Sequence, residues 1–256
     1  MSWISGIIGG GIGAMIAGPF GAIIGAAIGS SMGGPMTAPG NRIGFSEAER
    51  KQALFFTAAF SMVAKLAKAD GRVCENEIEA IQQVCRETLG LDDRTRRYAL
   101  SVFAQAKESS DSFETYAREF GNLFRQEPQM CTFMMSFLFQ VAMADGALHP
   151  GEEQMLLSAK QAFGLHDSVY QSLHGRFVGH TARTSVALNK HYEILGIGAD
   201  ADKATIKKAY RKKAAEFHPD KIEGKGLPPE FIRFANDKLA EINASYQAVI
   251  NARAGD

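Results

Sequence analysis

Apolar residues recur at three- and four-residue spacing through most of the chain after residue 45. This is the period of a helix with one buried face, and no stretch alternates apolar and polar residues as a half-buried strand does. The first helical segment opens with a capping box, in which Ser46 stands three residues before Glu49. The pattern therefore predicts an all-α protein. Further helices are expected over 75–88, 92–107, 112–124, 128–143, 150–163 and 167–177.

Two similar turns occur in this helical region, 75 residues apart. Each reads Ala-Asp-Gly, with a glutamate seven residues after the aspartate: Asp70 with Glu77, and Asp145 with Glu152. In one interpretation this is a helix–turn–helix unit used twice, in which glycine ends one helix and the acids favour the start of the next. In the other, the four carboxylates converge on a divalent cation. Both interpretations stay open, although an EF-hand is excluded because its ladder of aspartates is missing.

These turns and the helical pattern over 45–178 resemble the TerB-like (tellurite-resistance B) domain. The resemblance implies a helical domain whose two halves carry such turns. It also makes a divalent cation the candidate ligand, and no other cofactor is expected.

The segment from 191 to 221 is the most distinctive: HYEILGIGADADKATIKKAYRKKAAEFHPDK. A short helix should stop at Gly196, and Asp202 is a suitable N-cap for a helix that ends near Phe217. One side of this helix is an apolar stripe of Ile206, Tyr210, Ala214 and Phe217. The opposite side is a basic face, formed by Lys207, Lys208, Arg211 and Lys212.

Pro219 should end this helix, because proline lacks an N–H and disfavours helical geometry in the residue before it. A second helix is expected over 229–251, antiparallel to the first, with His218, Pro219 and Asp220 exposed in the loop between them. Its apolar residues are expected to cover the stripe: Phe231, Phe234, Leu239, Ile242 and Tyr246.

The motifs YEILG, IKKAYRKKAAEFHPDK and LAEINASYQAVI resemble, in order and spacing, the J domain of DnaJ-type co-chaperones over residues 190–256. The resemblance implies that the basic face docks on an acidic surface of a DnaK-type chaperone. It also implies that His218, Pro219 and Asp220 couple docking to ATP hydrolysis by that partner, with Asp220 accepting from a partner arginine. The implied role is that of a regulator and not of an enzyme.

The order of the segments resembles the DjlA family of membrane-anchored bacterial J proteins. Residues 1–41 form an uncharged segment, 45–178 the TerB-like domain, 179–189 a linker, and 190–256 the J domain. One residue departs from the J-domain pattern: Lys213 stands where an inward leucine is usual, and its stem is expected to lie along the core with the ammonium in water.

The uncharged segment is rich in glycine and carries no Lys or Arg before Arg42. Residues 4–31 are long enough to cross a bilayer, and the positive charges that follow predict a single pass through a bacterial inner membrane, with the N-terminus outside and the domains in the cytoplasm. The alternative is a peripheral glycine–alanine hairpin. A ladder of small residues suits packing between membrane helices in a homodimer: Gly21, Gly25, Gly29 and Gly33.

Charge and cysteine content narrow the function further. Residues 45–180 hold 14 Lys/Arg and 18 Asp/Glu, whereas 181–256 hold 13 and 10. This asymmetry indicates two modules but is too small for a nucleic-acid-binding surface. Cys74, Cys85 and Cys131 lack metal-type spacing and are expected to be buried apolar residues. The leading hypothesis is a membrane-tethered co-chaperone. The alternative is a metal or stress sensor with the J domain as its output.

Overall fold

The computed structural model describes residues 18–32, 46–68, 81–178 and 187–254. Within these ranges the chain forms helices and no strand, which confirms the all-α class. The longer helices are α2 (Pro19–Met32), α3 (Glu47–Leu66), α5 (Asp93–Glu108), α6 (Phe113–Leu123), α7 (Pro128–Ala142), α8 (Pro150–Ala162), α9 (Asp167–Val178), α10 (Ala187–Leu195), α11 (Lys203–Phe217) and α13 (Ile232–Ala254). Three shorter elements lie between them: a π-helical turn, η1 (Val84–Thr88), the helix α12 (Pro219–Glu223), and the 3₁₀ turn η3 (Pro229–Phe231).

Polar caps determine where several of these helices begin. Before α3, the Ser46 hydroxyl accepts from the Glu49 N–H at 3.2 Å, and the Glu49 carboxylate accepts from the Ser46 N–H at 3.0 Å. Asp92 accepts from the Thr95 N–H at 2.7 Å at the start of α5. These bonds satisfy backbone donors that the first turn of a helix leaves without partners. The capping box is therefore confirmed.

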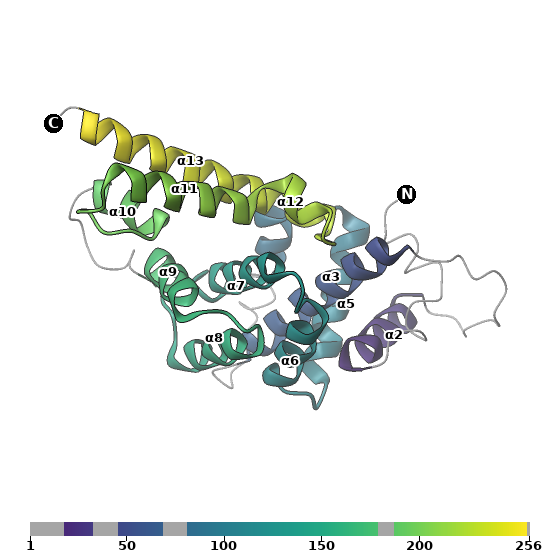
Figure 1. The fold of residues 1–256 in the computed structure, drawn as a ribbon. Helices are drawn as coiled ribbons and strands as arrows, with labels where there is room; N and C mark the ends of the chain where they lie inside the picture. Colours follow the sequence, from purple (N-terminus) through teal and green to yellow (C-terminus); the bar gives the residue numbers. More distant parts are fainter. Residues whose placement is uncertain (1–17, 33–45, 69–80, 179–186, 255–256) are drawn as a thin grey trace.

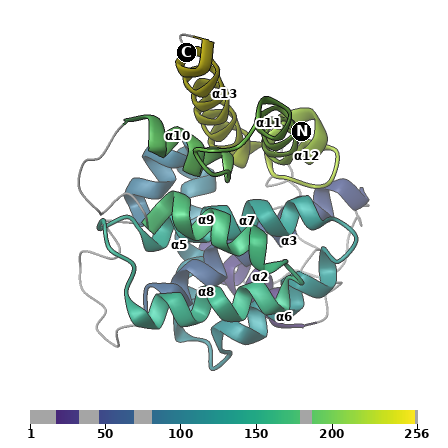
Figure 2. The same ribbon diagram turned by 60° about the vertical axis from the view of Figure 1, so that its left-hand side comes forward.

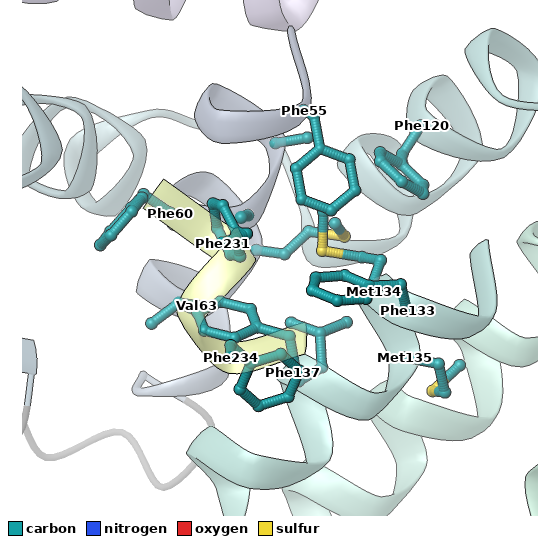
Figure 3. Packing of buried hydrophobic residues seen from close by; sticks show 14 of the residues in the cluster. Phe55, Phe60, Val63, Phe120, Phe133, Met134, Met135, Phe137, Phe231 and Phe234 are labelled. Carbon is teal, nitrogen blue, oxygen red and sulfur yellow. The ribbon is translucent and has the colours of Figure 1, made fainter. Parts of the chain in front are cut away.

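The centre of the bundle is aromatic. Helix α3 is buried all round from Ala53 to Leu66, and α7 is buried from Met130 to Phe139. Phe55 of α3 packs against Phe133 of α7, with 6.0 Å between the ring centroids. Phe55 also makes edge-to-face contacts with Phe120 of α6 and with Phe124, which follows α6, at 5.6 and 5.8 Å. Helices that are apolar on every side belong in a core, and these two form it (Figure 3).

The C-terminal helices are docked on this core. Helices α11 and α13 lie side by side across one end of the molecule (Figures 1 and 2). Phe231 packs against Phe55 at 5.2 Å and Phe137 at 5.0 Å, and Phe234 packs against Phe133 at 5.2 Å. We expected Phe231 and Phe234 to cover the stripe of α11. The ring contacts of both residues lie on α3 and α7, so these side chains join the C-terminal helices to the core.

The described part of the glycine-rich segment, α2, also packs on the bundle, beside α3, α5 and α6. Phe20 stacks on Tyr116 at 5.6 Å and is fully buried, as is Ile24. Gly21, Gly25 and Gly29 lie in this helix, whereas Gly33 and residues 1–17 lie outside the described residues. Among the described helices, none has the length and apolarity that crossing a membrane requires. The span over residues 4–31 therefore stays a prediction.

Candidate functional site: a basic helix face beside His218-Pro219-Asp220

The C-terminal unit is a helical hairpin held together by an apolar seam. Asp202 caps α11 by accepting from the Thr205 N–H at 2.8 Å. Gly196, with φ +70°, follows α10 in the left-handed region where a side chain would be strained. Ile206 is fully buried, and Tyr210 stacks on Tyr246 of α13 with ring centroids 4.1 Å apart. These contacts set the rotation of α11 about its own axis.

That rotation places the basic face in solvent. Lys207, Lys208, Arg211 and Lys212 are all exposed, whereas Ile206 and Phe217 of the same helix are fully buried. The structure therefore separates the basic and apolar sides of α11 as the sequence predicted. Four neighbouring exposed cations form a positively charged surface, which favours contact with anionic groups.

His218, Pro219 and Asp220 stand at the end of this face, where α11 stops and α12 begins. His218 has extended backbone dihedrals (φ −69°, ψ 119°), as expected for a residue before proline, and it is the residue that precedes α12. The Asp220 side chain is 87% exposed and the His218 side chain 45%, with 3.9 Å between His218 Nδ1 and Asp220 Oδ2. Pro219 and Asp220 are the first two residues of α12, and His218 caps it, so the three residues do not lie in an irregular loop as expected.

Within the described residues, His218 Nδ1 is buried and has no hydrogen-bond partner. The exposed Asp220 carboxylate is an acceptor that can take two parallel bonds from an arginine. The site therefore offers a partner a carboxylate at the surface and a half-buried imidazole behind it.

Lys213 does not carry its ammonium into water as expected. The side chain is buried between α11 and α9, and Nζ donates to Ser172 Oγ at 2.9 Å. Burial lowers the pKa of Lys213, and the nearby Glu216 carboxylate acts in the opposite direction. A residue in the position usual for an inward leucine therefore binds the N-terminal domain.

The structure describes two of the four carboxylates that were predicted to bind a cation. Asp70 and Glu77 lie outside the described residues. Asp145 accepts from the Ala147 N–H and contacts His149 Nε2, both at 3.0 Å, and Glu152 accepts from the His149 N–H at 3.0 Å. The second turn thus caps α8, and its Gly146 has the left-handed φ of +90° that the turn interpretation requires. No group of three or more potential ligands for a metal ion occurs among the residues described. The cation site stays a prediction.

Two of the three cysteines are described, and both are buried, as expected. Burial raises the pKa of the Cys85 and Cys131 thiols to about 12. At neutral pH these thiols are protonated and therefore poor nucleophiles. They act as small apolar residues of the core.

The sequence analysis missed Arg176, which is buried at the junction of the two domains and donates from Nη2 to Glu241 Oε2 at 2.5 Å. Its signal was an arginine between Leu173 and Phe177, on the apolar side of α9. A charged residue at an apolar helical position indicates a partner from another segment.

Two family models match the chain in this order: the tellurite resistance protein TerB over residues 56–174, and the DnaJ domain over residues 190–253. Among curated relatives, the Co-chaperone protein DjlA of Photobacterium profundum is 31% identical over 223 residues, which cover 80% of this chain and 79% of the relative. The protein of the same name from Shewanella oneidensis is 30% identical over 225 residues, which cover 84% and 86%. No solved structure matches the chain. The chain has a TerB domain followed by a J domain and belongs to the DjlA family of co-chaperones.

Proposed function

We propose that this protein recruits a DnaK-type chaperone through its J domain and stimulates the ATPase of that chaperone. The observation that carries the proposal is the exposed basic face of α11, which ends at His218-Pro219-Asp220 and is not covered by the docked TerB domain. The interface with the TerB domain instead uses Phe231, Phe234 and Lys213.

In this proposal, docking and triggering use different residues. Lys207, Lys208, Arg211 and Lys212 attract an acidic surface of the partner and orient the encounter, so they act mainly on the association rate. Asp220 then accepts from an arginine of the partner, and His218 lies against that contact. The chain hydrolyses no ATP itself, because the reaction takes place in the partner.

The steady-state ATPase of DnaK, measured with the full-length protein, tests the docking step. Reversing two charges in Lys207→Glu/Arg211→Glu is expected to raise the concentration of this protein needed for half-maximal stimulation. Added salt should have the same effect on the unsubstituted protein, because it screens the attraction. Arg118→Glu, an exposed substitution on α6, is the control and should behave like the unsubstituted protein. If the double variant stimulates at the same concentration as the control, the basic face is not the docking surface.

We propose further that residues 1–41 tether the protein to the cytoplasmic face of a bacterial inner membrane. Support comes from the absence of charged residues before Arg42 and from the basic residues that follow it. For α2, membrane insertion and packing on the bundle exclude each other, because the same apolar residues are buried in both. Alkaline carbonate extraction of membranes tests the proposal: a tethered protein stays in the pellet, and release into the supernatant would contradict a span.

The sensor hypothesis makes a different prediction. Mg²⁺, Ca²⁺ or Zn²⁺ would raise the melting temperature of the full-length protein, because a ligand that binds only the folded state stabilises it. Asp145→Asn together with Glu152→Gln should abolish the shift. An unchanged melting temperature with all three cations would contradict the metal-sensor hypothesis.

A further inference from the structure

The TerB domain contacts the J domain immediately before His218-Pro219-Asp220. Phe217 is the last residue of α11 and is fully buried. Its ring centroid lies 6.0 Å from that of Phe133 in α7 and 5.7 Å from the guanidinium carbon of Arg176 in α9. The end of α11 is therefore held on the TerB domain one residue before the imidazole of His218.

The TerB domain also contacts the loop that follows α12, residues 225–228. Lys225 Nζ donates to Gln129 Oε1 of α7, 96 residues away in the chain. Gly226 is buried, and a Cβ added to it would lie 2.6 Å from Lys51 Cβ of α3, well inside van der Waals contact. Its φ of +97° also favours glycine. The loop backbone therefore approaches α3 more closely than a residue with a side chain could.

The surface beneath this loop is itself fixed by an ion pair. Lys51 Nζ donates to Glu127 Oε1 at 2.9 Å, and Glu127 is the residue that precedes α7. Both side chains are partly buried, so solvent screens their attraction less than that of an exposed pair. The pair joins the N-terminal parts of α3 and α7, and Lys51 and Gln129 thus contact the loop from a single surface.

His218-Pro219-Asp220 stays accessible between these two sets of contacts. The Asp220 side chain is 87% exposed and that of His218 45%, and the basic residues of α11 are exposed as well. Docking on the TerB domain therefore leaves open the surface proposed to meet DnaK. It restrains the backbone that precedes the three residues and the loop that follows α12.

We propose that the TerB domain positions His218-Pro219-Asp220 for the stimulation of DnaK, with Gln129 and Lys51 as positioning residues that act through the loop 225–228. This inference rests on the proposed function and adds a role for the N-terminal domain in it. A segment that is already held in one conformation loses less entropy when a partner engages it.

The proposal predicts which kinetic parameter responds. In the proposed function the basic face supplies the docking, and the three residues act at the hydrolysis step. An interaction that contributes only at the reacting step changes the maximal rate and leaves binding unchanged. Loosening the loop should therefore lower the maximal stimulated rate, with no change in the concentration of this protein that gives half-maximal stimulation.

The steady-state ATPase of DnaK, titrated with the full-length protein, tests this. Gln129→Met removes the acceptor and Lys225→Met the donor, and each should lower the maximal rate roughly twofold to tenfold, as expected for one lost hydrogen bond. The double variant should be no slower than either single variant, because both substitutions remove the same bond. Gln161→Met, at an exposed glutamine of α8, is the matched control and should stimulate like the unsubstituted protein.

Exchanging the two side chains, in Lys225→Gln/Gln129→Lys, gives the same donor and acceptor in the opposite direction. This variant should recover the maximal rate of the unsubstituted protein. Recovery separates positioning from a direct contact between Lys225 and DnaK, because the exchange leaves no lysine at position 225. A maximal rate as low as that of Lys225→Met would overturn the proposal.

A second pair of variants tests the close approach to α3. Gly226→Ala places a Cβ against Lys51 and should also lower the maximal rate. Gly224→Ala makes the same change two residues earlier, at a φ of −62°, where the new Cβ would lie 4.0 Å from the Asp220 carbonyl oxygen. It should leave the maximal rate unchanged. If Gly226→Ala fails to fold, the variants of Gln129 and Lys225 still decide.

Two further results would overturn the proposal while the proposed function stands. One is a maximal rate in Gln129→Met equal to that of Gln161→Met. The other is a rise in the half-maximal concentration with an unchanged maximal rate, which would assign the loop to docking. If the unsubstituted protein itself left DnaK at its basal rate, the proposed function would fail, and this inference with it.

Discussion

Replacing Phe231 by alanine should separate the two domains without unfolding the J domain itself. Phe231 is fully buried, and its ring meets four others, of which Phe55 and Phe56 belong to α3 and Phe133 and Phe137 to α7. Truncating a buried phenylalanine typically costs about 3–5 kcal/mol. These ring contacts join the J domain to the TerB core. We therefore expect the substitution to weaken mainly the association of the two domains, and to leave the stability of the hairpin of α11 and α13 nearly unchanged.

Calorimetry and urea unfolding of the full-length protein measure this loss. The unsubstituted protein should unfold in one transition, because the aromatic cluster couples the domains. Phe231→Ala should unfold in two transitions. The free energy of unfolding for the first of them should be about 3–5 kcal/mol lower than that of the unsubstituted protein. Phe231→Leu keeps much of the apolar volume and should lie between the two proteins.

Leu123→Ala is the matched control, since Leu123 is 41% exposed and its truncation should change stability by less than about 0.5 kcal/mol. A single transition in Phe231→Ala, with stability within about 1 kcal/mol of the unsubstituted protein, would refute the claim that Phe231 holds the two domains together.

Asp92→Ala should lower the free energy of unfolding by about 1 kcal/mol, because it removes the cap of α5, and urea unfolding at pH 7 measures this loss; no change would contradict the role of the cap. Glu119 accepts from the Phe20 N–H at 3.1 Å, and burial raises its pKa to about 7. The folded state therefore holds this proton more tightly than the unfolded chain, so stability should fall as pH rises from about 4.5 to about 7. After allowance for solvent screening at this half-buried group, the loss relative to Glu119→Gln should be roughly 1 kcal/mol between pH 5 and pH 8, and parallel pH profiles of the two proteins would contradict it.

The local structure could be predicted from the sequence because its determinants are close together in the chain. Ser46 and Glu49 are three residues apart, and the capping box formed as expected. The left-handed conformations of Gly146 and Gly196 follow in the same way from their positions after apolar helical segments. The two sides of α11 are also separated by spacing alone, since Ile206 and Phe217 fall on one side and the basic residues on the other.

The contacts between domains could not be predicted, because apolarity shows that a residue is buried but not what it is buried against. Phe231 and Phe234 have the pattern of a helix that covers α11, yet their rings meet α3 and α7. Lys213 likewise has its hydrogen-bond acceptor, Ser172, 41 residues away in the chain. Helix α2 has the glycine-rich, uncharged composition of a membrane segment, and composition does not distinguish a membrane from a protein core. Short-range rules therefore predicted the two sides of α11, and the resemblance to the J domain implied the role of His218-Pro219-Asp220. The contacts between the domains became known only from the structure.

The most direct test of the proposed stimulation of DnaK is single-turnover hydrolysis of ATP already bound to DnaK, measured after the full-length protein is added. His218→Gln removes the imidazole beside Asp220, whereas His166→Gln makes the same change at an exposed histidine of the TerB domain. We predict that the unsubstituted protein and His166→Gln accelerate hydrolysis equally, and that His218→Gln leaves DnaK at its basal rate. Equal acceleration by His218→Gln would contradict the proposal that this site couples docking to hydrolysis.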